Sequence, residues 1–277
     1  PGSAIRSRSM TKMLLAIDIG NTTIALAAVH KGKVKAVQRM DTPPLSGGAD
    51  SRIMVSRLNR ALAIFRKKGY IFNKGILCSV VPEILTVVER TIVKSMGFEP
   101  EVVGRDVIVP IKNRYKNPKQ VGQDRLVGAY AALRLYGKPL IVIDLGTAIT
   151  FDVVSARGEY LGGAIVPGLR LSAESLFLKT ALLPKIVIKA PGNIIGKTTE
   201  ESMLSGLFYG YGALCRGMID LLGRRVGAYG HTPLRKMRPH VVMTGGHTRL
   251  MKKFVSPKIR IIDENLVFKG MALLVSP

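Results

Sequence analysis

Two aspartates occupy matching places in two similar segments, each at the end of an apolar run and two residues before a glycine. The first segment, LLAIDIGNTTIALAAVHKG, contains Asp18 and Gly20, and the second, LIVIDLGTAITFDVVSARG, contains Asp144 and Gly146. An aspartate at the end of a strand can cap the turn or point into a site, and the matched pair favours a site. Main-chain N–H groups of such turns suit polyphosphate oxygens, and the carboxylates can hold Mg²⁺ or another cation nearby, directly or through water.

The elements that carry these aspartates are predicted to be the same in both halves of the chain. Each segment alternates apolar runs with tight turns and predicts three antiparallel strands, the third being VKAVQRM in the first half and EYLGGAIV in the second. An apolar strand, a turn and an amphipathic helix follow in each half, as GILCSVVPEILTVVERTIVKSMG and as HVVMTGGHTRLMKKFV. The sequence therefore predicts two related α/β domains whose glycine turns face each other across one cleft.

The expected domain limits follow this repeat. Residues 10–123 are predicted to form an N-terminal domain, 124–139 a connecting helix around DRLVGAYAALRLYG, and 140–277 a C-terminal domain that ends in the helix-like ENLVFKGMALLV. Residues 1–9, PGSAIRSRS, look like a cloning remnant ahead of Met10 and are left out of the fold prediction.

Composition limits the classes of function. The 277 residues are 47% hydrophobic, enough to bury a core in each of two domains. The net charge of +24 would suit a nucleic-acid partner. The basic residues are scattered in twos and threes, however, without interleaved aromatic residues or a recognition-helix pattern, so the sequence does not favour specific nucleic-acid binding. A basic surface can equally concentrate small anionic substrates.

The sequence favours a cytoplasmic protein without a membrane partner. No signal peptide pattern follows Met13, and the two cysteines, Cys78 and Cys215, fit a reducing compartment. The most apolar stretch, MLSGLFYGYGALCRGMIDLL, contains Arg216 and Asp220 and predicts a buried amphipathic helix rather than a membrane span. Its glycines are interpreted as sites of close helix packing.

A candidate catalytic carboxylate lies between the two halves, in YKNPKQVGQDR. Phosphoryl transfer needs a carboxylate within reach of the attacking hydroxyl group and a positive group for an acidic substrate. Asp124 and Arg125 supply both from one loop, since the guanidinium group matches a planar carboxylate through paired donors. Asp124 can also be the N-cap of the following helix, and the two roles are compatible.

The ordered motifs resemble a known family. DIGNT, DLGTA and TGG resemble the phosphate-1, phosphate-2 and adenosine motifs of the actin, sugar-kinase and Hsp70 superfamily. Together with YKNPKQVGQDR, GEYLGGAIVPG, TALLP and GKTT, they make the chain similar to type III pantothenate kinases. The resemblance implies two duplicated actin-like (ribonuclease H-like) domains with an ATP cleft between them. It also implies ATP-dependent phosphorylation of pantothenate to 4'-phosphopantothenate, the first step of coenzyme A biosynthesis.

The resemblance also implies roles for individual residues. Asp124 would accept the proton of the substrate, Asp144 would hold a monovalent cation, K⁺ or NH₄⁺, and Asp18 would hold Mg²⁺ directly or through water. The implied ATP contacts are Asp18, Ile19, Gly20, Asn21, Thr22, Thr23, Ile24, Ala25, Thr147, Gly245 and Gly246. The implied pantothenate contacts are Tyr115, Gly122, Gln123, Asp124, Arg125 and Thr199. Members of the family are homodimers with substrate sites close to the subunit interface.

Two other hypotheses stay open at this point. The +24 charge is compatible with a non-catalytic ATP-binding or nucleic-acid-binding regulator on the same fold, and a different small-molecule kinase of the superfamily is the third possibility. Gln123 and Gly128 depart from the residues common in the family, which puts the packing of the substrate loop in question. His247, beside TGG, has two interpretations, a contact with the nucleotide and a solvated loop histidine, and the sequence favours the second.

Overall fold

The computed structural model describes residues 11–43, 48–226, 238–256 and 258–275. The chain forms two compact units, the first from residues 1–109, 122–127 and 267–277, and the second from 110–121 and 128–266. These units are defined by packing, whereas the expected domain limits follow the repeat, and those limits stay a prediction. The suggested cloning remnant, 1–9, lies outside the described residues.

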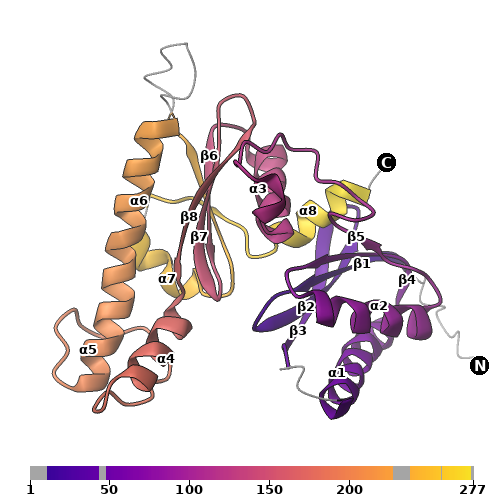
Figure 1. Ribbon diagram of the computed structural model, residues 1–277, viewed down its shortest axis with the longest axis horizontal. Coiled ribbons are helices and arrows are strands. Elements are labelled where there is room, and N and C mark those ends of the chain that lie inside the picture. The colour runs from indigo at the N-terminus through magenta and orange to yellow at the C-terminus, as the bar shows by residue number, and fades with distance from the viewer. Residues whose placement is uncertain (1–10, 44–47, 227–237, 257, 276–277) are drawn as a thin grey trace, which may run out of the picture. The chain divides into compact units, whose positions relative to one another are not determined.

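The first unit contains a five-stranded sheet in the order β3-β2-β1-β4-β5 (Figure 1). β1 pairs antiparallel with β2 and parallel with β4, so β1 lies in the interior of the sheet. The elements of this part of the chain are β1 (Thr11–Ile19), β2 (Thr23–His30), β3 (Lys33–Asp41), α1 (Gly48–Lys67), β4 (Tyr70–Ser79), α2 (Pro82–Met96) and β5 (Glu101–Val102).

The second unit contains a sheet of the same topology, in the order β8-β7-β6-β9-β10. β6 pairs antiparallel with β7 and parallel with β9, as β1 does with β2 and β4, so the predicted duplication is confirmed. The strands are β6 (Leu140–Leu145), β7 (Ala148–Val154), β8 (Tyr160–Pro167), β9 (His240–Thr244) and β10 (Ile261–Ile262). The helices are α4 (Leu169–Lys179), α5 (Thr199–Ser205), α6 (Tyr211–Val226) and α7 (Thr248–Val255).

One helix joins the halves of the chain in sequence, and another is the last element of the chain. The predicted connecting helix is α3 (Gln123–Tyr136), which follows a 3-10 turn at Pro118–Gln120, and the predicted last helix is α8 (Leu266–Val275). The first residues of α3 pack with the first unit and the rest with the second, while α8 from residue 267 onwards packs with the first unit. The C-terminal end of the chain thus returns to the N-terminal sheet.

Each sheet buries one face under helices of its own unit. In the first unit Leu15, Ile17 and Ile19 of β1 share a core with Leu58 of α1 and Val88 of α2. In the second unit the strands pack against α4, α6 and α7, and Ile143 and Phe208 are fully buried there. The central strands are rigid because both neighbours and the covering helices fix them, and a residue at the end of such a strand is held in place.

The predicted amphipathic helix is confirmed as α5 and α6, which are joined by a π-helical turn at Gly206–Gly210. No helix among the residues that the structure describes is long and apolar enough to cross a membrane. The glycines of α6 differ in their surroundings. A β-carbon on Gly212 would lie 2.3 Å from the Phe254 carbonyl oxygen, whereas one on Gly217 would meet no atom within 4 Å. Close helix packing therefore explains Gly212, and it does not explain Gly217.

The same substitution at these two positions of α6 should change stability in opposite directions. Gly212→Ala should destabilise the protein by about 1–3 kcal/mol, because the main chain of α7 has to move away. Gly217→Ala should stabilise it by about 0.5–1 kcal/mol, because alanine restricts the unfolded chain and favours the helix. Urea unfolding of both variants measures the two changes, and equal effects would contradict the packing at Gly212.

Candidate functional site

The turn after β1 is closed by short polar contacts. The Gly20 N–H group donates to the Thr23 carbonyl oxygen (3.0 Å), and the Thr42 hydroxyl group donates to the Gly20 carbonyl oxygen (2.7 Å). Asn21 and Thr22 are exposed at its tip, whereas the side chains of Ile19 and Ile24 are fully buried. Ile19 and Ile24, and also the buried Ala25, can therefore meet a nucleotide only through their main chain.

Asp18 is half-buried at the end of β1 and is paired in register with Cys78 of β4. Cys78 is fully buried. Burial raises the pKa of the Cys78 thiol well above its usual value, and the nearby charges of Asp18 and Asp124 raise it further. The charges of Asp18 and Asp124 thus both raise the pKa of Cys78, so the structure places both carboxylates near the same thiol.

Asp124 lies in the first turn of α3 and not at its N-cap. The Leu126 N–H group donates to the Gly122 carbonyl oxygen, which places the cap at Gly122, and an Asp124 carboxylate oxygen accepts a hydrogen bond from the Arg125 N–H group (2.8 Å). The positive end of the helix dipole favours a carboxylate there. A β-carbon at Gly122 would lie 2.5 Å from that Asp124 oxygen, so glycine leaves room for it.

Gln123, which departs from the family pattern, packs on a glycine of the first unit. Gly104 has a φ of +86°, and a β-carbon there would lie 2.7 Å from the Gln123 side-chain carbonyl carbon. The glutamine side chain is therefore directed to the Gly104 main chain, and it forms part of the support under the start of α3.

In the second unit the Asp144 carboxylate lies between two glycine turns. A β-carbon on Gly245 would lie within 2.3 Å of an Asp144 oxygen, and one on Gly146 would lie 3.4 Å from it. Gly245 also has a φ of +93°, a conformation that favours glycine. Asp144 pairs in register with Thr244, so the DLGTA and TGG motifs meet at one end of the second sheet.

Thr147 and His247 lie at the same turns. Thr147 is exposed, and its carbonyl oxygen accepts a hydrogen bond from Gly168, the residue before α4 (2.9 Å). His247 is half-buried, and its ring atom Nδ1 is buried. The main-chain N–H group of His247 donates to the Leu145 carbonyl oxygen (3.1 Å). Burial and the charge of Arg170 lower the pKa of the imidazole. The interpretation as a solvated histidine is therefore wrong, because the ring packs against the phosphate-2 motif.

The other two predicted substrate residues lie elsewhere in the second unit. Tyr115 is half-buried before the 3-10 turn, and its N–H group donates to the Asn113 side chain (3.0 Å). Thr199 is exposed at the first position of α5, directly after the N-cap Thr198. Neither residue belongs to the Asp144 turns.

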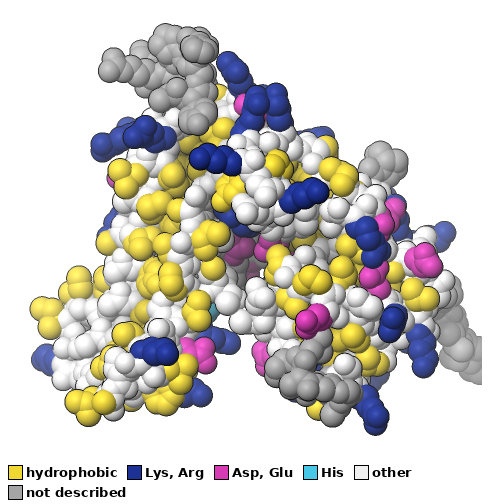
Figure 2. Space-filling model, in the orientation of Figure 1, with side chains coloured by type: hydrophobic (Ala, Val, Ile, Leu, Met, Phe, Trp, Pro, Cys, Tyr) yellow, Lys and Arg dark blue, Asp and Glu magenta, His cyan; other side chains and the backbone are white. Residues whose placement is uncertain are grey.

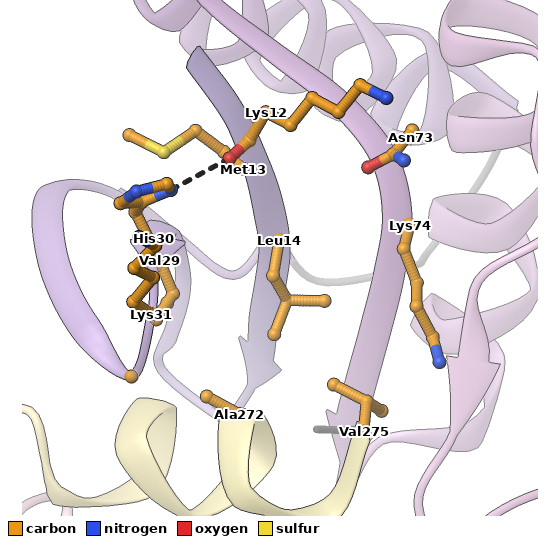
Figure 3. Close-up of a pocket in the computed structure, with 11 residues that line it drawn as sticks. Lys12, Met13, Leu14, Val29, His30, Lys31, Asn73, Lys74, Ala272 and Val275 are labelled. Carbon is orange, nitrogen blue, oxygen red and sulfur yellow. Dashed lines mark hydrogen bonds between the residues drawn. The ribbon is translucent and has the colours of Figure 1, made fainter. Parts of the chain in front are cut away.

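A separate pocket of about 240 Å³ opens at the other end of β1 (Figure 3). Leu14, Val29 and the α8 residues Ala272 and Val275 line its apolar part, while lysines lie around it. Leu14 and Asp18 are four residues apart on β1, about 13 Å along a strand. No predicted site residue is among the eleven described residues that line this pocket, so it is not the candidate site.

The donors present fit cations that are held mainly by phosphate and water. Among the described residues, no group of three or more His, Cys, Asp or Glu side chains gathers as a metal cluster. Asp144 is a single carboxylate beside the main chain of Gly245, and carboxylate oxygens suit a hard cation. Asp18 supplies one further carboxylate at the first turn, so each turn offers one acidic ligand.

Two sheets of identical topology, each with an aspartate and a glycine turn at the end of its central strand, define a protein of the duplicated actin-like class. The model of the type III pantothenate kinase family matches residues 14–221, and the chain belongs to that family. A type III pantothenate kinase of Persephonella marina is 41% identical over 241 residues, which cover 87% of this chain and 90% of that protein.

A second relative, a type III pantothenate kinase of Finegoldia magna, is 36% identical over 265 residues. The matched region covers 96% of this chain and 97% of that protein. Among solved structures, a reductive activator for corrinoid, iron-sulfur protein has a TM-score of 0.50 at 15% identity, covering 97% of this chain and 61% of that chain. The structural likeness shows the fold alone, whereas the two sequence relatives agree with the family match.

Cys78 is a buried neighbour of the candidate site that the sequence did not indicate, since a cysteine in an apolar strand looks like ordinary core. Its thiol should not react with a thiol reagent in the folded protein at pH 8, because burial and two carboxylates keep it neutral. Burial also raises the pKa of Cys215, to about 11. Ellman's reagent should therefore release almost no colour from the native protein and two equivalents after denaturation. Rapid native reaction at Cys78, located by mass spectrometry, would contradict this arrangement.

Proposed function

We propose that this protein transfers the γ-phosphoryl group of ATP to the terminal hydroxyl group of pantothenate, the first step of coenzyme A biosynthesis. The observation that carries the proposal is the pair of carboxylates, Asp18 and Asp124, that act together on Cys78 inside the first unit. The carboxylate at the glycine turn would act on the phosphate side, and the carboxylate at the helix start would act as the base. The named relatives are kinases of the same family, which supports this substrate.

In this mechanism Asp124 accepts the proton of the pantothenate hydroxyl group as its oxygen attacks the γ-phosphorus atom. The new O–P bond forms while the bond to the β–γ bridging oxygen breaks, and ADP leaves. Positioning and charge stabilisation account for most of the catalysis in such a transfer. Arg125 follows Asp124 directly and would pair with the pantothenate carboxylate, and Gly122, Gln123, Tyr115 and Thr199 would complete the substrate contacts.

ATP would contact two sets of main-chain groups, those of residues 18–25 in the first unit and those of Thr147, Gly245 and Gly246 in the second. Asp18 would hold Mg²⁺ directly or through water, and Asp144 would hold K⁺ or NH₄⁺. Bound cations of this kind neutralise the charge that develops on the phosphate oxygens. The proposal places the reaction in the cytoplasm, which both free, buried cysteines suit.

The regulator hypothesis rested on the +24 charge, and no further observation favours it. Scattered lysines and arginines produce electrostatic binding that weakens steeply as salt rises. A kinase with a basic surface accounts for the same charge, since ATP and pantothenate are both anions.

The decisive experiment for the function is a coupled assay of ADP release with pantothenate and ATP·Mg²⁺, run in potassium and then in sodium. We expect turnover that depends on pantothenate and is faster in potassium. Absence of turnover in both salts would refute the function. Turnover only with another hydroxyl compound, found in a substrate panel, would keep the kinase and refute the substrate.

Asp124→Asn should lower kcat by about 100-fold or more, because the amide cannot accept the proton and a positioned base contributes about that factor. The variant should keep its fold and its ATP affinity, measured by circular dichroism and calorimetry. Glu99→Gln makes the same carboxylate-to-amide change at an exposed position of the first unit and should keep normal turnover. Near-normal kcat for Asp124→Asn would show that another group is the base.

We further propose that the protein is a homodimer whose interface lies on the second unit. Large apolar side chains are exposed on α4, α6 and the segment after α4, and Figure 2 shows hydrophobic side chains gathered over these elements. They are Leu171, Phe177, Leu178, Leu182, Val187, Ile194, Ile195 and Leu221, of which Leu182 is 91% exposed. Exposed apolar patches of this kind mark interaction surfaces, and a second copy of the chain is the occupant we expect.

The double variant Leu178→Glu/Leu182→Glu should change a dimer into a monomer, because charges would be buried without partners at the interface. Sedimentation velocity at micromolar concentration measures the change. Ile108→Glu, at a position of the first unit that is 71% exposed, is the matched control and should remain dimeric. A double variant that stays dimeric would move the interface away from this surface.

A further inference from the structure

A buried carboxylate that the mechanism does not use lies in the second sheet. Asp152 of β7 is only 2% exposed. The Tyr160 hydroxyl group donates to one of its oxygens (2.7 Å) and the Thr150 hydroxyl group to the other (3.0 Å). A buried polar group is unfavourable unless it is hydrogen-bonded. The Thr150 bond therefore holds the Asp152 carboxyl group, and the Tyr160 bond holds the end of the Tyr160 side chain against it.

The main chain of Tyr160 in turn holds the segment before Tyr115. The Tyr160 N–H group donates to the Lys112 carbonyl oxygen (2.9 Å), and the Arg114 N–H group donates to the Tyr160 carbonyl oxygen (2.8 Å). Glu159, the residue before Tyr160, forms ion pairs with Arg114 (2.7 Å) and Lys112 (3.3 Å). Residues 112–114 are thereby attached to the start of β8 along their whole length.

The Tyr115 ring then rests on the main chain of Gly162. A β-carbon at Gly162 would lie 3.1 Å from Cδ2 and 2.9 Å from Cε2 of that ring, and real β-carbons essentially never come as close as the second distance. Gly162 also has a φ of +103°, which favours glycine. The ring can occupy its observed place only while residue 162 has no side chain.

We propose that Asp152, Tyr160 and Gly162 are positioning residues that set the orientation of Tyr115 and thereby the affinity for pantothenate. The inference rests on the proposed function, in which Tyr115 contacts the substrate. Asp152 and Tyr160 fix the place where the segment 112–114 is attached, and Gly162 fixes how closely the ring approaches β8. None of the three needs to touch the substrate, so they should affect substrate binding more than the chemical step.

The test compares Gly162 with Gly158. Both have a positive φ, but only a β-carbon at Gly162 would meet the Tyr115 ring. Gly158 has a φ of +82° and leads into β8, but a β-carbon there would meet only Leu133 and Lys138 side chains at 3.6 Å or more. Gly162→Ala should raise the KM for pantothenate about tenfold and leave the KM for ATP within twofold. Gly158→Ala should lower the melting temperature as well, yet keep both KM values within twofold.

A double-mutant cycle shows whether the effect passes through Tyr115. In a Tyr115→Ala background, Gly162→Ala should cause no further rise in the KM for pantothenate, because no ring remains to be displaced. An equal rise in both backgrounds would overturn the inference. If Gly162→Ala does not fold, Tyr160→Phe decides the question: it should raise the pantothenate KM about threefold with kcat nearly unchanged, and an unchanged KM would overturn the proposal.

Failure of this inference differs from failure of the proposed function. A wild-type protein without pantothenate turnover would overturn both. A wild-type protein that turns over, while Gly162→Ala keeps its pantothenate KM, would overturn only the positioning role.

Discussion

The arrangement of the second unit depends on the space taken by the Asp144 carboxylate. An oxygen of this group lies where Gly245 would carry a side chain, and main-chain atoms of Leu145 lie 2.6 and 2.7 Å from the same point. β6 and β9 can therefore end side by side in this way only with glycine at 245. The turn before β7 and the TGG turn both start beside this contact, directly after β6 and β9.

The first unit also has an aspartate before a glycine turn at the end of its central strand, but other residues surround it. Asp18 takes the place of Asp144 at the end of the central strand, but its neighbour on β4 is Cys78, and the turn is closed by a hydrogen bond from Thr42, the residue after β3. The duplication has thus kept the backbone plan while changing the side chains around it. In the proposed mechanism this difference places the Mg²⁺ ligand and the base with one sheet and the monovalent cation ligand with the other.

The start of α3 combines three constraints in a few residues. Gly122 leaves room for the Asp124 carboxylate, the helix dipole favours its charge, and the Gln123 side chain packs on Gly104. A carboxylate in such a place is oriented before any substrate binds, and preorganisation of this kind is how a base contributes to phosphoryl transfer. The departure at Gln123 is accommodated by a glycine with positive φ and leaves Asp124 in the first helical turn.

The sequence by itself determined the duplicated strands, the two aspartate turns, the connecting helix and the family, because these depend on local apolar periodicity, on glycine turns and on motifs in a fixed order. Only the tertiary structure decided which distant residues meet. Cys78 lies beside two carboxylates, His247 packs on the phosphate-2 motif, and Tyr115 rests on Gly162, 47 positions further along the chain. Such contacts depend on the volumes and backbone angles of segments that are far apart in sequence, and no local pattern carries that information.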